Sequence, residues 1–188
     1  MAKRCRRTAL YLNYQREYCR YMSATYDMME ATLDYMLQQP KLKKKKCAIV
    51  LDIDGFLISE DDICANREIF TRAMNFIIDM KNLYKKKLTI FIITARQSDE
   101  GVAEDLNKYG ILCGKDQDIE AVLFDYNQIG TIPSKIDNRK LIRDAGYTII
   151  LAGGDNHYSD LVPENETSGF SQTANFLLPN IYRHEYTS

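Results

Sequence analysis

The sequence predicts an α/β fold with a parallel sheet and helices on both faces, because apolar segments of strand length alternate with longer segments of helical periodicity. The apolar runs are continuous, which is typical of strands that are buried on both faces. Crossovers between parallel strands are expected to be right-handed. Such sheets bind ligands at the carboxyl ends of their strands, so residues that directly follow a strand are the first candidates for function.

Residues 8–39 contain neither proline nor glycine and are expected to form a long N-terminal helix. Tyr11, Tyr14, Tyr18 and Tyr21 recur at helical spacing, and we interpret this stripe as the face that packs on the core. The alternative is a surface that stacks nucleic-acid bases. We assign residues 1–40 to this helix and residues 41–188 to the main domain.

A lysine-rich segment, Lys41 to Lys46, follows Pro40 and precedes the first apolar run. We interpret it as a solvated linker, and the alternatives are a phosphate-binding patch or a nuclear address. The apolar runs predicted as strands are residues 47–52, 88–93, 121–124, 147–151 and 174–178. The helices predicted between them are residues 66–84, 99–109 and 134–145, with Gly110 and Gly146 as C-terminal stops for the last two.

The composition is that of an ordinary globular protein, with 45% hydrophobic and 27% charged residues among 188. This length fits one domain with at most a small insertion. A formal net charge of -1 excludes a general electrostatic attraction to nucleic acid.

The 5 cysteines are scattered without a C-x-x-C pair, which argues against a disulfide framework and a zinc site. No apolar run reaches the roughly 18 residues of a membrane span. The basic start of the chain is not followed by the apolar core of a signal peptide. We therefore expect a cytoplasmic protein with reduced thiols and no membrane partner.

Two carboxylates, Asp52 and Asp54, follow the first predicted strand, separated by one residue. Alternate side chains of an extended segment share a face, so both can converge on one ligand. Carboxylates held close together need a cation, and a site of oxygen ligands for a phosphate compound favours Mg²⁺. The alternatives are an ordinary surface turn and a calcium loop.

The second predicted strand is followed by Thr94, Ala95 and Arg96. Thr94 can donate a hydrogen bond to a phosphate oxygen, and Arg96 can support this loop or pair with an anion. The alternative is a helix cap at Thr94 and a surface charge at Arg96.

The fourth predicted strand runs into Gly153 and Gly154, which we interpret as a tight turn that presents Asp155 to a metal shared with the acids of the first strand. Asp160 follows as a further acid. Upstream, Lys135 begins a predicted helix and can bring a positive charge to the same edge of the sheet.

The order of these motifs resembles the four-motif pattern of the haloacid dehalogenase (HAD) superfamily, and more narrowly the bacterial class C and plant acid phosphatases of its subfamily IIIB. The resemblance rests on the Tyr-rich helix, AIVLDID at residues 48–54, Ser134-Lys135, GDN at residues 154–156 and LPNIY at residues 178–182. It runs nearly end to end, with weaker matching between residues 56 and 88. It implies a HAD-like Rossmannoid sheet and a Mg²⁺-dependent phosphomonoester hydrolase that acts on nucleotides or other small phosphomonoesters.

The resemblance implies a role for each of the four catalytic candidates. Asp52 is the nucleophile, Asp54 the general acid and base, Thr94 the phosphate-binding hydroxyl, and Lys135 the cation that neutralises the phosphoryl oxygens. Ala95 and Arg96 join the substrate site.

It also implies a metal site formed by Asp52, the backbone carbonyl of Asp54, and Asp155. Asp160 and Asn156 support this site, and Tyr182 is the aromatic side chain that contacts the substrate.

The chain departs from the family pattern after Asp54, where Gly55 and Phe56 leave no Thr or Ser to hold the loop. The segment up to Thr94 is short, which predicts a reduced cap within residues 56–87 and an open cleft. An open cleft admits larger substrates, so a nucleic-acid end-processing phosphatase is one alternative function. A non-catalytic phospho-ligand-binding protein is the other.

Overall fold

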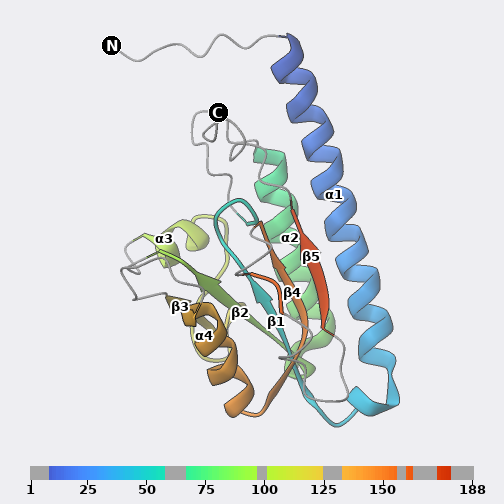
Figure 1. Ribbon diagram of the computed structural model, residues 1–188, viewed down its shortest axis with the longest axis vertical. Helices are drawn as coiled ribbons and strands as arrows, with labels where there is room; N and C mark the ends of the chain where they lie inside the picture. Colours follow the sequence, from blue (N-terminus) through green and yellow to red (C-terminus); the bar gives the residue numbers. More distant parts are fainter. Residues whose placement is uncertain are drawn as a thin grey trace.

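Five parallel strands form one sheet in the order β3-β2-β1-β4-β5 in the computed structural model (Figure 1). The structure describes residues 9–57, 67–96, 101–124, 133–155, 160–162 and 173–178. The strands are β1 (Lys46–Leu51), β2 (Leu88–Thr94), β3 (Ala121–Phe124), β4 (Tyr147–Gly154) and β5 (Ala174–Leu177). The helices are α1 (Ala9–Gln38), α2 (Arg67–Tyr84), α3 (Val102–Asn107) and α4 (Pro133–Asp144), with short 3-10 helices η1 (Pro40–Leu42) and η2 (Lys85–Lys87).

The predicted α/β class with an all-parallel sheet is confirmed. The apolar runs are strands because both faces of the sheet are covered: every residue of β1 after Lys46 is buried. Gly110 and Gly146, which follow α3 and α4, have φ of 80° and 89°. These left-handed conformations confirm both as helix stops.

The prediction was wrong at the end of β4, where Gly153 and Gly154 belong to the strand and do not form a turn. Gly153 pairs with Leu51 of β1, and Gly154 pairs with Leu177 of β5. Glycine is required here for space, because a Cβ on Gly153 would overlap the ring of Phe56.

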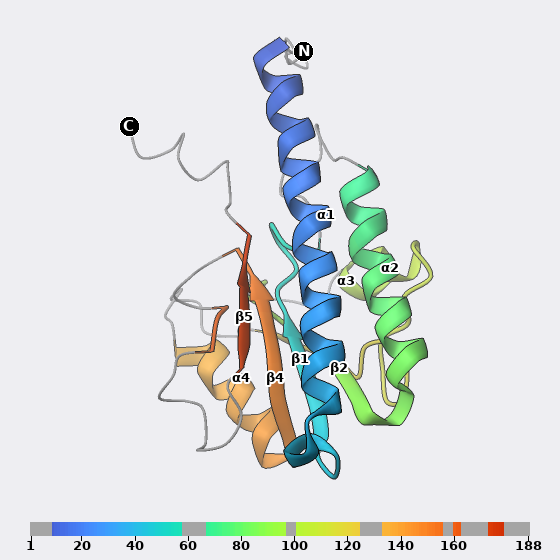
Figure 2. The same cartoon turned by 90° about the vertical axis from the view of Figure 1, so that its right-hand side faces the viewer.

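The helices cover the two faces unequally, with α1, α2 and α3 on one face and α4 on the other (Figures 1 and 2). The chain moves outward from β1 through α2 to β2 and through α3 to β3, and then α4 leads back past β1 to β4. Right-handed crossovers in opposite directions place their helices on opposite faces. The chain leaves β1 and β4 in opposite directions, and sheets of this kind bind ligands at the carboxyl ends of two such strands.

Helix α1 packs on α2 and on β4 and β5, and in Figure 2 it runs beside α2. Its buried side chains recur at intervals of three and four residues: Met22, Tyr26, Met29, Leu33 and Leu37. The predicted inward packing is wrong for Tyr21, which is 49% exposed. The buried apolar stripe therefore lies on a different face of the helix from Tyr21. The side chains of Tyr11, Tyr14 and Tyr18 lie outside the described part of the chain.

The predicted cap interval, residues 56–87, contains α2, which is a crossover helix of the core. Ala73, Phe76 and Ile77 of α2 are fully buried. Residues 58–66 lie outside the described part of the chain. Within the described residues, no helix is both long and apolar enough to cross a bilayer.

Candidate functional site

Three carboxylates meet at the carboxyl ends of β1 and β4. Asp52 is the first residue after β1 and Asp155 the first after β4, and Asp160 follows a few residues later. Oxygen atoms of the three lie within 4.8 Å of one another. Their exposed fractions are 7%, 9% and 4%, so water cannot screen their mutual repulsion. This group has the oxygen ligands and the spacing to hold a metal ion.

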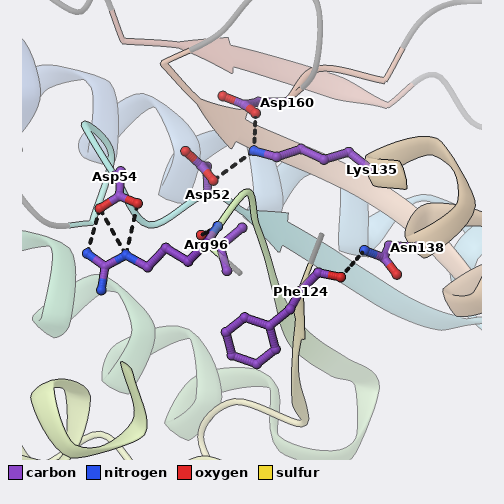
Figure 3. A network of polar contacts seen from close by, with 8 residues as sticks. Asp52, Asp54, Arg96, Phe124, Lys135, Asn138 and Asp160 are labelled. Carbon is purple, nitrogen blue, oxygen red and sulfur yellow. Dashed lines mark hydrogen bonds and ion pairs between the residues drawn. The ribbon is translucent and has the colours of Figure 1, made fainter. Parts of the chain in front are cut away.

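Lys135 adds a buried positive charge to this group from the first turn of α4 (Figure 3). Its Nζ donates to Asp52 Oδ1 at 2.8 Å and to Asp160 Oδ1 at 2.5 Å. The three carboxylates and Lys135 together carry an excess of two negative charges when all are ionised. A divalent cation would neutralise that excess.

Burial raises the pKa of Asp52 to about 7; Asp160 and Asp155 add to this rise, whereas Lys135 acts against it. For Lys135, burial alone would lower the pKa, but Asp52 and Asp160 outweigh it and the pKa is raised. The ammonium therefore stays charged inside the carboxylate group. A cation bound beside Asp52 would favour its ionised form.

Two glycines make room for the carboxylates. Gly55 has φ +72°, and a Cβ there would lie 2.6 Å from Asp155 Oδ2. A Cβ on Gly154 would overlap the side chain of Asp160. Larger residues at either position would push a carboxylate out of the group.

The loop after β1 is held by Tyr26 of α1. The buried Tyr26 hydroxyl donates to the carbonyl oxygen of Phe56 at 2.9 Å. The centres of the Tyr26 and Phe56 rings lie 5.6 Å apart. The Phe56 ring also packs against Gly153. Phe56 is therefore a packing residue that fixes the loop carrying Asp52 and Asp54.

Asp54 faces away from this group and pairs with Arg96 in Figure 3. Arg96 Nε donates to Asp54 Oδ2 at 2.9 Å and Nη2 donates to Oδ1 at 2.6 Å. These hydrogen bonds raise the pKa of the Arg96 guanidinium. The two residues come from the ends of β1 and β2, so the pair links the loops that follow these strands.

Thr94 is fully buried at the end of β2. Its hydroxyl oxygen accepts from the backbone N–H of Arg96 at 3.2 Å, which supports the loop. Ala95, beside it, is exposed.

The structure thus brings Asp52, Asp155, Asp160 and Lys135 into one group. Asp160, predicted as a supporting residue, is the third carboxylate of this group. The Asp54 carboxylate pairs with Arg96 instead. Asn156 and Tyr182 lie outside the described residues. Sequence reasoning missed Tyr26, although its spacing from Met22 and Met29 placed it on an apolar helix face.

A scan against models of protein families found no match, and a search of curated proteins found none either.

Proposed function

We propose that the chain is a Mg²⁺-dependent phosphomonoester hydrolase of the HAD type, in which Asp52 accepts the phosphoryl group. The observation that supports this most is the buried group of Asp52, Asp155 and Asp160 with Lys135 inside it. A nucleophilic carboxylate beside a cation site and an ammonium is the arrangement that phosphoryl transfer to an Asp needs. Oxygen-only ligands suit Mg²⁺, which would neutralise charge on the phosphoryl oxygens when bound.

In the first step, an Asp52 oxygen forms a bond to phosphorus while the bond to the leaving oxygen breaks. The leaving oxygen takes a proton from Asp54, and an aspartyl-phosphate remains. In the second step, water attacks phosphorus and gives its proton to Asp54. This step releases inorganic phosphate and regenerates the Asp52 carboxylate. Lys135, held 2.8 Å from Asp52, stabilises negative charge in both steps.

Arg96 must release Asp54 before Asp54 can serve as the acid, because the guanidinium occupies both oxygens of the carboxylate. A substrate phosphate would compete with the Asp54 carboxylate for the Arg96 guanidinium, because the phosphate would bind at the same edge of the sheet. We infer that substrate binding moves Arg96 from Asp54 to the phosphate. Arg96 then has two roles. It binds the substrate phosphate when substrate is present, and it holds Asp54 in place when no substrate is bound.

The test is phosphate release from a panel of nucleoside monophosphates, sugar phosphates and end-phosphorylated oligonucleotides with Mg²⁺. We expect turnover by the wild type and none by Asp52→Asn, because the amide is a poor nucleophile and a weaker metal ligand. The matched control is Asp137→Asn, which changes an exposed carboxylate on α4 and should leave turnover unchanged. Acid-quenched wild-type enzyme treated with hydroxylamine should be modified at Asp52 only when substrate was present.

Turnover by Asp52→Asn at more than a few per cent of wild type would remove Asp52 from the nucleophile role. Saturable binding of a phosphorylated compound without phosphate release would instead support a phospho-ligand-binding protein.

A further inference from the structure

A cavity lies at the amino ends of the strands, at the opposite edge of the sheet from the carboxylate group. Its lining includes Lys46 and Tyr147, which are the first residues of β1 and β4. It also includes Lys85 and Lys86, which precede β2. The six residues of β1 separate the two edges by roughly 20 Å. The cavity volume of about 680 Å³ is within the range of small-ligand sites.

Lysines outnumber carboxylates in the lining of this cavity. Lys46, Lys81, Lys85 and Lys86 all line it, and in the described part of the chain none of them forms an ion pair with a carboxylate. Lys46 instead lies over the Tyr147 ring, with Nζ 5.8 Å from the ring centre. The four ammonium groups of the lining exceed its three carboxylates by one charge, and grouped at a concave surface they attract an anion.

The cavity also has an acidic part, formed by Asp116, Asp118 and Glu120. Backbone N–H groups hold two of these side chains: Leu112 donates to Asp118 at 2.9 Å, and Asp116 donates to Glu120 at 3.1 Å. Carboxylates in these positions disfavour a continuous polyanion such as a nucleic-acid strand. They favour a compact ligand that also carries hydroxyl or amino donors.

The backbone around the cavity is strained. Within the described residues, the non-glycine residues with positive φ are Lys85, at 39°, and Asp116, at 64°, and both line the cavity. Asp adopts this conformation fairly often, whereas Lys does so rarely. Helix α1 holds the strained turn on both sides: Tyr84 donates to Asp34 at 2.8 Å, and Lys87 donates to the Leu37 carbonyl. Strain maintained in this way is a feature of ligand sites.

We propose that this cavity binds a nucleoside polyphosphate, whose phosphates contact the lysines and whose sugar or base donors contact the carboxylates. The site is separate from the candidate active site, and the proposal does not depend on the proposed function.

The experiment is calorimetric titration of the full chain with adenylyl imidodiphosphate in EDTA, which prevents hydrolysis and metal-dependent binding at the carboxylate group. We expect saturable binding at one site. Lys81→Ala/Lys86→Ala should weaken it by about tenfold or more, because a hydrogen bond to a charged group contributes a factor of this order. The matched control is Lys43→Ala/Lys44→Ala, which removes the same charge from exposed residues that do not line the cavity. That variant should change the affinity by less than about threefold.

Melting curves check that both variants fold, and Lys81→Ala alone replaces the double variant if that one does not. Absence of binding at about 1 mM nucleotide would overturn the proposal. Equal weakening in both double variants would also overturn it, because it would indicate diffuse attraction at this end of the molecule. Two further ligands test the chemistry: a single-stranded oligonucleotide or inorganic tripolyphosphate that binds as tightly as the nucleotide would contradict the assigned ligand class.

Discussion

Replacing Lys135 with Met removes the ammonium from the carboxylate group while keeping a side chain of similar length. Lys135 donates to Asp52 at 2.8 Å and to Asp160 at 2.5 Å, and it is 6% exposed. Each hydrogen bond to a charged group contributes about 1.5–3 kcal/mol. Breaking a buried ion pair costs about 3–5 kcal/mol. We therefore expect the free energy of unfolding to fall by about 3–5 kcal/mol near pH 8, which lowers the melting temperature by roughly 10 °C for a chain of this length.

The loss should depend on pH, because Asp52 can take up a proton. In the wild type the pKa of Asp52 is already raised to about 7, and removing Lys135 takes away an influence that lowers it. An Asp whose pKa is higher in the folded than in the unfolded state stabilises the fold at low pH, and this contribution is lost as pH rises through the folded pKa. The variant should thus be closest to wild type near pH 5 and furthest from it near pH 8.

Urea denaturation followed by circular dichroism at these two pH values measures both free energies, with and without Mg²⁺. Added Mg²⁺ should recover part of the loss near pH 8, because a bound cation takes over the neutralisation of Asp52 and Asp160. Lys140→Met is the control, since Lys140 is an exposed lysine on the same helix. A loss for Lys135→Met that is no larger than that of Lys140→Met, or one unaffected by both pH and Mg²⁺, would refute this account of the site.

Three other changes have defined outcomes. Tyr26→Phe leaves the Phe56 carbonyl without its 2.9 Å donor and should lower the free energy of unfolding by about 1–3 kcal/mol, measured by urea denaturation; an unchanged value would show that Tyr26 does not hold the loop. Gly154→Ala forces Asp160 out of the carboxylate group and should weaken Mg²⁺ binding, measured by calorimetry, by about tenfold, and unchanged affinity would exclude Asp160 as a ligand. Arg96→Ala should weaken inhibition by inorganic phosphate by about tenfold, and equal inhibition would mean that Arg96 binds only Asp54.

The strands could be predicted because a parallel sheet buries both faces and leaves continuous apolar runs in the sequence. The positions of Asp52 and Asp155 follow from the same rule, since both directly follow buried strands. The buried face of α1 could not be predicted from its tyrosines, because Tyr21 and Tyr35 are exposed whereas Tyr26 is buried.

Contacts between segments that are far apart in the sequence could not be predicted from local sequence patterns. Arg96 and Asp54 are separated by 42 residues, and the sequence shows a guanidinium and a carboxylate near strand ends without showing that they pair. Gly153 and Gly154 suggest a turn in any sequence, because glycine is common in turns. Only the neighbouring Phe56 and Asp160 show that these glycines are required for space inside a strand.

A series of contacts through these glycines links helix α1 to the carboxylate group. Tyr26 fixes the Phe56 carbonyl, and the Phe56 ring occupies the space beside β4 that a side chain at position 153 would need. The next residue, Gly154, leaves the corresponding space to Asp160. The loop that follows Asp54 is thus held by a tyrosine 30 residues earlier in the chain. Because α1 supplies that tyrosine and shares one hydrophobic core with β1 and α2, the position of Asp52 depends on the N-terminal helix.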